Sequence, residues 1–482
     1  MRFDLKSFDF VECERAPDAL AVAAADRNLS WAQLRAEALA WADAARAHGA
    51  APDVPVAIYG HKQASFFVAM VGALLVGAPF VPVDTIYPPE RLRRIVEIVR
   101  PAAVYDAAAD RFEPGHGASL AERGLAYVMF TSGSTGDPKG VQIGRESVGL
   151  LGDWMLGSFG LGDAPVFMNQ APFSFDLSMY EVFATLASGG ACVLNSRELI
   201  ATPAAWIARL AEQGITVWVS TPSFAHQQLA NRDFSPATLP TLRTFLFCGE
   251  PLPAALAKKL RQRFPDAAIL NTYGPTEATV ATTWIEITDA VLAQHDPLPV
   301  GHAKPDCELL VTDGEICIVG DHVMRGYLNR ADLNEQKLFV HADGRRGFRT
   351  GDLGQMEEGG LLFCRGRMDD QIKLNGYRIE LAEIDEALHG LPGAEGGACA
   401  VLRRPDGTAV RLIGFVTGAA VAGEQPAFLD AQALSNWKDL LAQRLPPYMV
   451  PSELVACPAL PMSNNHKIDR KKLIDIYAGI PA

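Results

Sequence analysis

Several features that assign proteins to special classes are scarce or missing in this chain. Its eight cysteines form no C-x-x-C pair and no even ladder of spacings, which argues against both a disulfide framework and a zinc site. Lys and Arg (43) are outnumbered by Asp and Glu (56), for a formal net charge of −13. Non-specific nucleic-acid binding needs a cationic footprint, so no nucleic-acid partner is expected.

Targeting and membrane segments are not evident either. The N-terminal stretch MRFDLKSFDFVECERAP has early acidic residues and no apolar core, so we expect no signal peptide. The 18 residues from Phe66 to Val83 carry no charge, but two glycines and two prolines interrupt them and FVPV reads as a strand. We expect a buried helix and a buried strand there, no membrane insertion, and a cytoplasmic protein.

The chain is long enough for more than one folding unit, and its first part alternates two patterns. With 482 residues, 49% hydrophobic and 21% charged, it has the composition of an ordinary globular protein. Helical stretches at 203–214 and 253–264 lie among short β-rich runs, and this alternation predicts parallel sheets covered by helices on both faces. The strand candidates are 54–60, 80–83, 126–130, 190–195, 215–220 and 244–249.

The pattern of predicted helices, strands and turns changes twice further along the chain. Residues 298–365 have more turns and fewer helices, which predicts a β-barrel-like unit. A break follows near Gly366–Asp370, and strand and helix signals then continue to the end. We expect an α/β protein with an N-terminal core domain over 1–368, built from two doubly wound mixed or parallel sheets and the barrel-like unit. Residues 369–482 form a small, mobile α+β domain in this prediction.

The segment with the most chemical content is a Gly- and Ser/Thr-rich loop. An apolar strand, YVMF, runs into TSGSTGDPKG (131–140), which has three glycines, four hydroxyl residues and a lysine. Glycines allow close approach to phosphate, and hydroxyl and amide groups supply donors to its oxygens. It is not a Walker A loop, because Gly140 follows Lys139 where Ser or Thr is required. Taken alone, it could also be a surface loop.

Together with five other segments, this loop resembles the adenylate-forming superfamily of acyl-CoA synthetases, luciferases and nonribosomal peptide adenylation domains. The other five are LVGAPFVPVD (75–84), NTYGPTEAT (271–279), FRTGDLG (348–354), GRMDDQIKLNGYRIELAEID (366–385) and PMSNNHKIDRKKL (461–473). They occur in the family's order and span nearly the whole chain. The resemblance implies that a carboxylate attacks the α-phosphate of ATP, a reaction that depends on positioning and electrostatic stabilisation.

The resemblance assigns roles residue by residue. Glu277 would hold Mg²⁺, Thr276 would touch the α-phosphate, and Lys467 would bridge the substrate carboxylate and that phosphate. Other residues would bind ATP: Thr131, Ser132, Ser134, Thr135 and Lys139 its β- and γ-phosphates, Tyr273 its adenine, Asp352 its ribose and Arg367 its ribose or phosphate. By itself, Asp352 in TGDL reads more simply as a turn former, and Lys467 as part of a solvated basic run. A His at 466 replaces the glycine that the family commonly has before this lysine.

A carboxylate in APFSFDLSMYEVF suggests an amino-acid substrate. In amino-acid-activating members, an Asp at the position of Asp176 pairs with the substrate ammonium, which would explain a buried carboxylate. Asp176 could also cap the helix of LSMYEVF. The residues that would line the amino-acid pocket suit a small substrate. They are Asp176, Leu177, Tyr180, Ser220, Leu246, Cys248, Thr272, Val280 and Ala281.

Within the superfamily, the stretches NQAPFSFDLS, FLFCGE and NTYGPTEATVA look most like stand-alone D-alanine:D-alanyl carrier protein ligases. Cys248 matches a cysteine that favours the D-enantiomer there. Tyr180 departs from the Met expected at its position, and the segment 101–124 is short. The family also implies rotation of the C-terminal domain about Asp369 between the two half-reactions, with Gly376 lining a pantetheine tunnel.

The expected acceptor is the phosphopantetheine thiol of a separate carrier protein, because the chain shows no carrier, condensation or thioesterase motif, and a monomer is expected. Three alternatives remain open. One is an adenylation enzyme for L-Ala, Gly or Ser in natural-product biosynthesis, and another is an acyl- or aryl-CoA ligase. The third is a non-catalytic binding or regulatory protein of the same fold.

Overall fold

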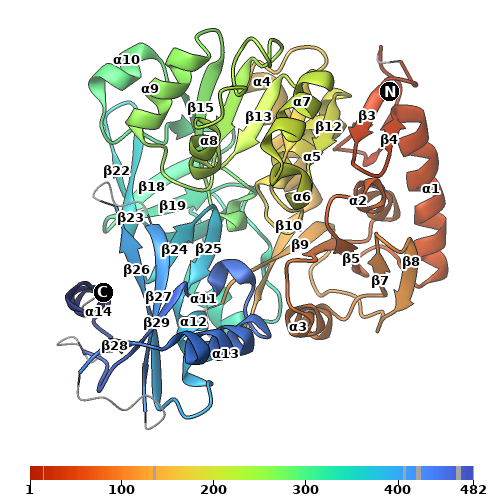
Figure 1. Cartoon of the computed structure of the whole chain (residues 1–482). Helices are drawn as coiled ribbons and strands as arrows, with labels where there is room; N and C mark the ends of the chain where they lie inside the picture. The colour runs from red at the N-terminus through yellow and green to blue at the C-terminus, as the bar shows by residue number, and fades with distance from the viewer. Residues whose placement is uncertain (15, 134–136, 405–408, 419–424, 463–467, 481–482) are drawn as a thin grey trace. The chain divides into compact units, whose positions relative to one another are not determined.

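The protein is described by a computed structural model covering the whole chain except residues 15, 134–136, 405–408, 419–424, 463–467 and 481–482. It divides into two compact units (Figure 1). Unit 1 contains Met1–Asp84, Ile98–Phe130 and Gly140–Met368. Unit 2 contains Thr85–Glu97, Thr131–Lys139 and Asp369–Ala482, so two early segments group with the C-terminal part of the chain.

Two large mixed sheets dominate the first part of the chain. The first sheet, in the described residues, has seven strands, and β5, β6, β7 and β9 form its parallel pairs. Its spatial order is β20 (Gly326–Tyr327), β10 (Lys139–Gly144), β9 (Leu125–Thr131), β6 (Phe80–Asp84), β5 (Val56–Gly60), β7 (Ala103–Asp106) and β8 (Arg111–Pro114).

The second sheet has nine strands within the described part of the chain, and its central strands from β15 to β3 are parallel. Its order is β17 (His302–Ala303), β16 (Thr283–Glu286), β15 (Ala268–Tyr273), β14 (Thr244–Phe247), β13 (Val217–Ser220), β11 (Val166–Asn169), β12 (Ala191–Leu194), β3 (Leu20–Ala23) and β4 (Asn28–Ser30). The six predicted strands all overlap strands of these two sheets, and the predicted helices overlap α7 (Pro203–Glu212) and α9 (Ala254–Arg263). The α/β prediction is confirmed.

Helices cover both faces of the second sheet. Successive strand side chains point to opposite faces, so Val217 and Leu246 join one hydrophobic core while Trp218 and Phe245 join another. The first core contains side chains of α1 (Trp31–Ala47), α2 (Ala64–Val76), α4 (Arg145–Ser158) and α5 (Ser178–Ser188). The second core contains those of α7, α8 (Pro222–Gln228) and α9.

The uncharged run predicted to be a buried helix and strand is α2 followed by β6. A capping box of Ser30 and Gln33 starts the neighbouring α1, on which α2 packs. Every residue of α2 except Leu75 is buried, and Gly77 ends it in a left-handed conformation with φ of 80°. Over the described residues, none of the helices has both the length and the apolar character needed to cross a membrane.

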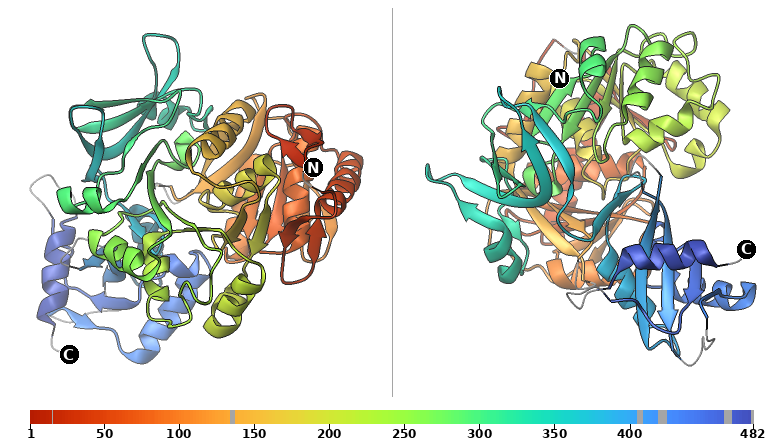
Figure 2. Two further views of the ribbon diagram at one scale, coloured as in Figure 1. Left: turned by 90° about the horizontal axis from the view of Figure 1, so that it is seen from above. Right: turned by 90° about the vertical axis from the view of Figure 1, so that its left-hand side faces the viewer.

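The predicted β-rich part is an antiparallel sheet, which Figure 2 shows as a separate group of strands within unit 1. It consists of β18 (Glu308–Thr312), β19 (Glu315–Val319), β22 (Arg346–Met356), β21 (Leu338–Val340) and β23 (Leu362–Arg367). The remaining elements of unit 1 are short: β1 (Arg2–Asp4), β2 (Asp9–Val11), α6 (Arg197–Ile200), η1 (Thr276–Ala278), α10 (Asp289–Gln294) and α11 (Ala331–Lys337).

Unit 2 is an α+β body with its own core. Its sheet has the order β26 (Gly396–Arg403), β27 (Ala409–Thr417), β29 (Glu453–Ala456) and β28 (Ala427–Phe428), and β24 (Gln371–Leu374) pairs with β25 (Tyr377–Glu380). Its helical elements are α12 (Leu381–His389), α13 (Ala431–Ala442), η3 (Pro447–Met449) and α14 (Arg470–Gly479). Most of α3 (Pro89–Val99) also belongs to this unit. A buried ion pair joins Arg91 of α3 to Glu383 of α12 at 2.5 Å.

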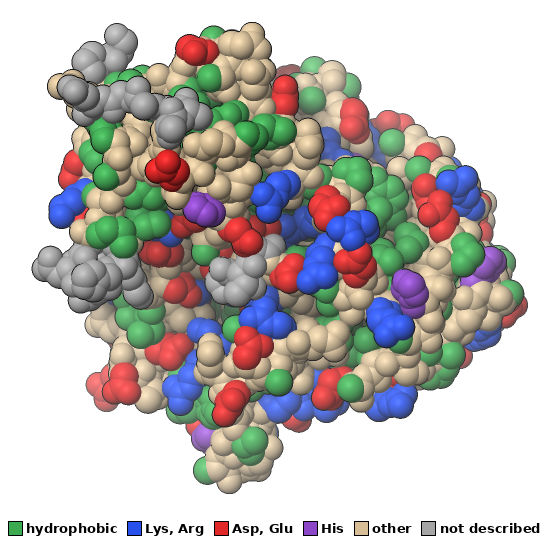
Figure 3. All heavy atoms as spheres, turned by 90° about the horizontal axis from the view of Figure 1, so that it is seen from below, with side chains coloured by type: hydrophobic (Ala, Val, Ile, Leu, Met, Phe, Trp, Pro, Cys, Tyr) green, Lys and Arg blue, Asp and Glu red, His purple; other side chains and the backbone are tan. Residues whose placement is uncertain are grey.

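Charges of both signs are mixed on the face drawn in Figure 3. Lys and Arg side chains lie among Asp and Glu side chains there, and neither sign gathers into a continuous area. A nucleic-acid-binding face is instead marked by clustered Lys and Arg.

Candidate functional site

Asp176 lies in the turn between β11 and α5, with 7% of its surface exposed. The backbone N–H groups of Ser178 and Met179 donate to the carbonyls of Phe175 and Asp176, at 3.0 and 2.9 Å. The N-cap position of α5 is Leu177, one residue after Asp176.

The residues predicted to line the amino-acid site are all buried in unit 1. We call them the Asp176 group: Asp176, Leu177, Tyr180, Leu246, Cys248, Thr272, Val280 and Ala281. The Tyr180 hydroxyl donates to Thr272 Oγ1 at 3.0 Å, and Thr272 donates to the Phe247 carbonyl at 2.8 Å. Burial raises the pKa of Tyr180, and the nearby Cys248 and Asp176 raise this pKa further.

The Asp176 group draws on two strands and one strained turn. Leu246 is in β14, Cys248 directly follows that strand, and Thr272 is in β15, near the carboxyl ends of parallel strands where α/β proteins bind ligands. Val280 has a φ of 69° and Thr279 one of 57°, which is uncommon for side chains branched at Cβ. Such strain persists only where surrounding contacts impose it.

Contacts hold this strained turn from both sides. The Thr279 hydroxyl donates to the His322 carbonyl at 2.7 Å, and the Lys304 ammonium donates to the Ala281 carbonyl at 2.9 Å. Lys304 is buried, and burial lowers its pKa to about 8. The wall formed by Val280 and Ala281 therefore has a defined position before any substrate binds.

Three residues predicted to bind the nucleoside are brought together in unit 1. The Tyr273 hydroxyl donates to Asp352 Oδ2 at 2.5 Å, and Arg367 Nη1 donates to Asp352 Oδ1 at 2.8 Å. Asp352 lies in the long strand β22 and pairs in register with Arg367 of β23. The turn-former reading of Asp352 is therefore wrong: the side chain is fixed by a strand and by two neighbours.

Glu277 is fully buried in η1. The Tyr327 hydroxyl, from β20 of the first large sheet, donates to Glu277 Oε1 at 2.6 Å, and the neighbouring Thr276 is also buried. Mg²⁺ in nucleotide sites takes one or two protein carboxylates and completes its shell with phosphate oxygens and water. A single buried carboxylate beside Thr276 fits that requirement.

The Gly- and Ser/Thr-rich loop that was predicted to bind phosphate belongs to unit 2 as far as Lys139, and its described residues contact the segment around β25. Ser132 Oγ donates to the Arg378 carbonyl at 2.9 Å, and Lys139 Nζ pairs with Glu380 Oε1 at 2.9 Å. The buried hydroxyl of Thr131 has no hydrogen-bond partner among the described residues. Ser134 and Thr135 lie outside the described residues.

Gly376 lies in the turn of the β24–β25 hairpin of unit 2, and Asp369 lies just before the first strand of that hairpin. Gly376 has a φ of 85° in the turn between β24 and β25, where a left-handed conformation favours glycine. Asp369 is the first residue of the C-terminal segment of this unit, and its Oδ1 accepts from the Gln371 N–H at 3.2 Å. His466 and Lys467 lie outside the described residues, so the contacts of the predicted catalytic lysine are not defined.

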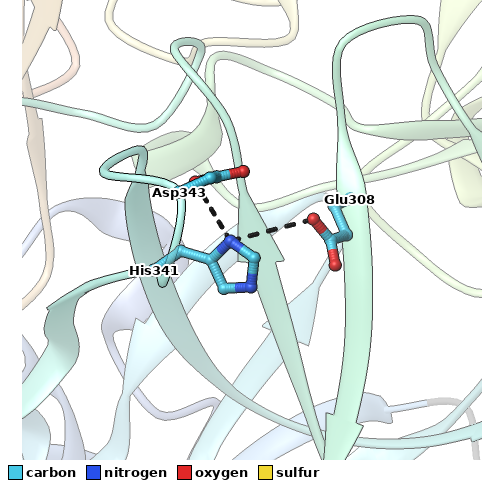
Figure 4. A group of neighbouring side chains, drawn as sticks. All are labelled: Glu308, His341 and Asp343. Atoms are coloured by element: carbon cyan, nitrogen blue, oxygen red, sulfur yellow. Dashed lines mark ion pairs between the residues drawn. The ribbon is translucent and has the colours of Figure 1, made fainter.

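One other group of side chains in the described part of the chain has the composition of a metal site (Figure 4). His341 Nδ1 lies 3.1 Å from Asp343 Oδ1 and 3.9 Å from Glu308 Oε2. The Arg345 guanidinium, however, contacts both carboxylates at 2.6 Å. Because an arginine already neutralises these acids, we assign no metal to the group.

Some buried polar residues near Asp176 were not predicted to matter. Lys62, Asn169 and Glu181 form a hydrogen-bonded chain, and Asn169 and Glu181 stand on either side of Asp176 in the sequence. The available signal was a charge within an apolar run: Lys62 precedes QASFFVAM, and Glu181 interrupts SMYEVFATL. Tyr327, the partner of Glu277, had no comparable signal, because the two are 50 residues apart.

Comparison with known proteins places these residues in context. A model of the family described as AMP-binding enzyme matches residues 10–118 and 107–328. The D-alanine--D-alanyl carrier protein ligase of Bacillus cereus (strain G9842) is 39% identical over 499 residues, covering 95% of this chain and 96% of the relative. The protein of the same name from Bacillus anthracis is 38% identical over 493 residues, with the same coverage.

Solved structures show the same fold. An NRPS protein containing adenylation and PCP domains has a TM-score of 0.78 at 28% identity, covering 95% of this chain and 81% of that one. A Vibrio cholerae adenylation domain in complex with glycyl-adenosine-5′-phosphate has a TM-score of 0.81 at 22% identity, covering 97% and 99%. The second likeness concerns the fold alone.

Proposed function

Because the chain belongs to the AMP-binding enzyme family, whose fold and adenylate-forming motifs it shares, we propose that this ligase activates D-alanine with ATP and transfers it to a carrier protein. The observation that carries the choice of substrate is the buried carboxylate of Asp176, next in sequence to Leu177, whose side chain shares a hydrophobic core with Tyr180 and Cys248. A buried carboxylate favours a cationic partner, and the substrate ammonium would supply it. The names of relatives with 38–39% identity over 95% of the chain support D-alanine.

The surroundings of Asp176 favour a small side chain. Tyr180 is fully buried and its hydroxyl is committed to Thr272, which itself donates to a backbone carbonyl. Leu246, Val280 and Ala281 are apolar and could not pair with a charged or amide side chain. Activation of L-Ala, Gly or Ser remains the second candidate. An acyl- or aryl-CoA ligase would leave Asp176 without a function.

The ATP-binding roles rest on two groups, one in each unit. In unit 1, Tyr273 would stack near adenine, Asp352 would accept from the ribose hydroxyls and Arg367 would reach ribose or phosphate. In unit 2, the loop residues Thr131, Ser132, Ser134, Thr135 and Lys139 would bind the β- and γ-phosphates. Lys139 is paired with Glu380 in this structure, so binding of the triphosphate would replace that carboxylate.

The first half-reaction joins the two substrates. A carboxylate oxygen of D-alanine attacks the α-phosphorus of ATP, the bond to the bridging oxygen breaks, and pyrophosphate leaves. Thr276 and Lys467 would hold the α-phosphate, where negative charge builds up. Glu277 would hold Mg²⁺, which when bound neutralises charge on the phosphate oxygens.

The second half-reaction releases AMP. The sulfur of the phosphopantetheine thiol attacks the acyl carbon, a thioester forms, and the bond to the phosphate oxygen of AMP breaks. We propose that unit 2 turns about Asp369 between the steps and that Gly376 then borders the pantetheine arm, where the lack of a side chain permits close approach. We further propose a cytoplasmic monomer whose carrier is a separate protein.

The substrate is tested by amino-acid-dependent ATP–pyrophosphate exchange. The panel contains D-Ala, L-Ala, Gly, L-Ser, L-Pro, β-Ala and a short fatty acid. We expect D-Ala to give the highest kcat/KM, because relatives 38–39% identical over 95% of the chain are named D-alanine--D-alanyl carrier protein ligases. A preference for L-Ala, Gly or Ser would change the assigned substrate and leave the assigned reaction unchanged. Exchange with the fatty acid alone would overturn the assignment.

The role of Asp352 is tested with 3′-deoxy-ATP. In the wild type, removal of one ribose hydroxyl should raise the KM for the nucleotide about tenfold, since a hydrogen bond to a charged group is worth about 1.5–3 kcal/mol. Asp352→Ala should raise the KM for ATP by a similar factor and no longer distinguish ATP from 3′-deoxy-ATP. Asp332→Ala removes an exposed ion pair with Arg330 and serves as the control. If Asp352→Ala still distinguishes ATP from 3′-deoxy-ATP as strongly as the wild type does, Asp352 does not bind the ribose.

A further inference from the structure

Lys62 is a buried cation that the reaction described above does not use. It is the second residue after β5 of the first large sheet, and only 3% of its surface is exposed. Burial lowers its pKa to about 8. Burying an ammonium group costs free energy unless other groups interact with its charge. The contacts of Lys62 therefore indicate its role.

Among the described residues, the hydrogen bonds and the ring contact of its ammonium group are to the segment that leads to Asp176. The ammonium donates hydrogen bonds to Asn169 Oδ1, at the end of β11, and to the carbonyl of Ala171 in the following loop. It also lies 4.2 Å from the centroid of the Phe173 ring, a distance typical of a cation–π contact. Lys62 therefore joins the first sheet to the second across the beginning of this loop.

The same chain of contacts reaches the other end of the loop. Asn169 Nδ2 donates to Glu181 Oε1 at 3.1 Å, and Glu181 is fully buried in α5, the helix that follows Asp176. The Asn169 amide thus accepts from the ammonium and donates to the carboxyl group, the orientation in which both of its polar atoms are satisfied. Burial raises the pKa of Glu181 to about 8.

These contacts bracket the turn that presents the carboxylate. Ala171 and Phe173 precede Asp176 by five and three residues, and Glu181 follows it by five. We propose that Lys62 is a positioning residue for Asp176, acting through the Ala171 carbonyl and the Phe173 ring to place the carboxylate for the substrate ammonium. This inference rests on the proposed function, because it takes Asp176 as the amine-binding group.

The first test replaces the cation by an apolar side chain of similar length, Lys62→Met. We expect the KM for the amino acid that the wild type prefers to rise about tenfold or more, since small displacements of binding groups have effects of this size. The KM for ATP should stay within twofold of the wild type, because Tyr273, Asp352 and Arg367 are held by hydrogen bonds with one another. Arg209→Met is the matched control. Arg209 is a partly buried cation elsewhere in unit 1, and it too donates to a backbone carbonyl, that of Ala23.

A second variant separates positioning from stability. Lys62→Met/Glu181→Met removes both buried ionisable groups, and replacing both partners by apolar residues often restores stability. The Ala171 carbonyl stays without its cation, so we expect Tm to recover while the KM for the amino acid remains about tenfold high. Recovery of this KM together with Tm would show a merely structural role and overturn the proposal. An equal rise in the KM for ATP, or an unchanged KM for the amino acid in Lys62→Met, would also overturn it.

The Asp176→Ala variant distinguishes failure of the positioning role of Lys62 from failure of the proposed function. If Asp176→Ala raises the KM for the amino acid and the Lys62 variants do not, only the positioning role is wrong. If Asp176→Ala also leaves this KM unchanged, the amine is bound elsewhere and the proposed function itself is in error.

Discussion

Lys467→Ala is expected to lower the rate of D-alanyl-adenylate formation by about 10²–10³-fold, the usual effect of removing one group that stabilises transition-state charge. Transfer of the acyl group from supplied D-alanyl-AMP to the carrier thiol should retain much of the wild-type rate. The physical reason is that charge on the α-phosphate builds up as pyrophosphate leaves, whereas the second step breaks the bond between the acyl carbon and AMP.

The two half-reactions are measured separately, by pyrophosphate exchange and by single-turnover transfer from the adenylate. Lys471→Ala is the control, because this residue lies in the same basic run and is exposed. If Lys467→Ala slows both half-reactions equally, the alternation of unit 2 about Asp369 is contradicted. If Lys471→Ala has the same effect, the contribution comes from the net charge of the run.

Asp176→Ala is expected to raise the KM for D-alanine by about 10²-fold or more, because removing one partner of a buried ion pair costs about 3–5 kcal/mol. The KM for ATP should change little. Asp176→Asn keeps the size of the side chain and should show most of the same effect, which would assign it to charge.

Propionate, which lacks the amine, provides the sharper readout for this carboxylate. The wild type should favour D-alanine over propionate strongly, and Asp176→Ala should lose most of that preference. Asp266→Ala removes an exposed carboxylate of unit 1 and should change neither substrate's KM. A preference for D-alanine that survives in Asp176→Ala would mean that another group binds the amine.

Elements with a strong local pattern were predictable. The apolar run at 66–83 could be assigned to a buried helix and strand because glycine and proline break it and its second half is β-rich; these are α2 and β6. The short β-rich runs between helical stretches likewise became the central strands of the two large sheets. In each case the information lies within about fifteen neighbouring residues, which is the range over which hydrophobic periodicity acts.

Contacts between distant segments were not predictable in the same way. Asp352 read as a turn former because TGDL is a turn-like tetrapeptide, yet it lies in an eleven-residue strand and accepts from Tyr273, 79 residues away. A single sequence carries no signal for such a pairing, since it depends on which strands become neighbours.

The sequence by itself determined the α/β alternation, the order of the adenylate-forming motifs and the presence of a carboxylate at position 176. Only the tertiary structure decided that this carboxylate is buried, and that Lys62 donates to Asn169, 107 residues away, at the start of the loop that leads to it. The reason is that motifs and periodicity are local, whereas burial of a charge is settled by the partners that folding brings to it.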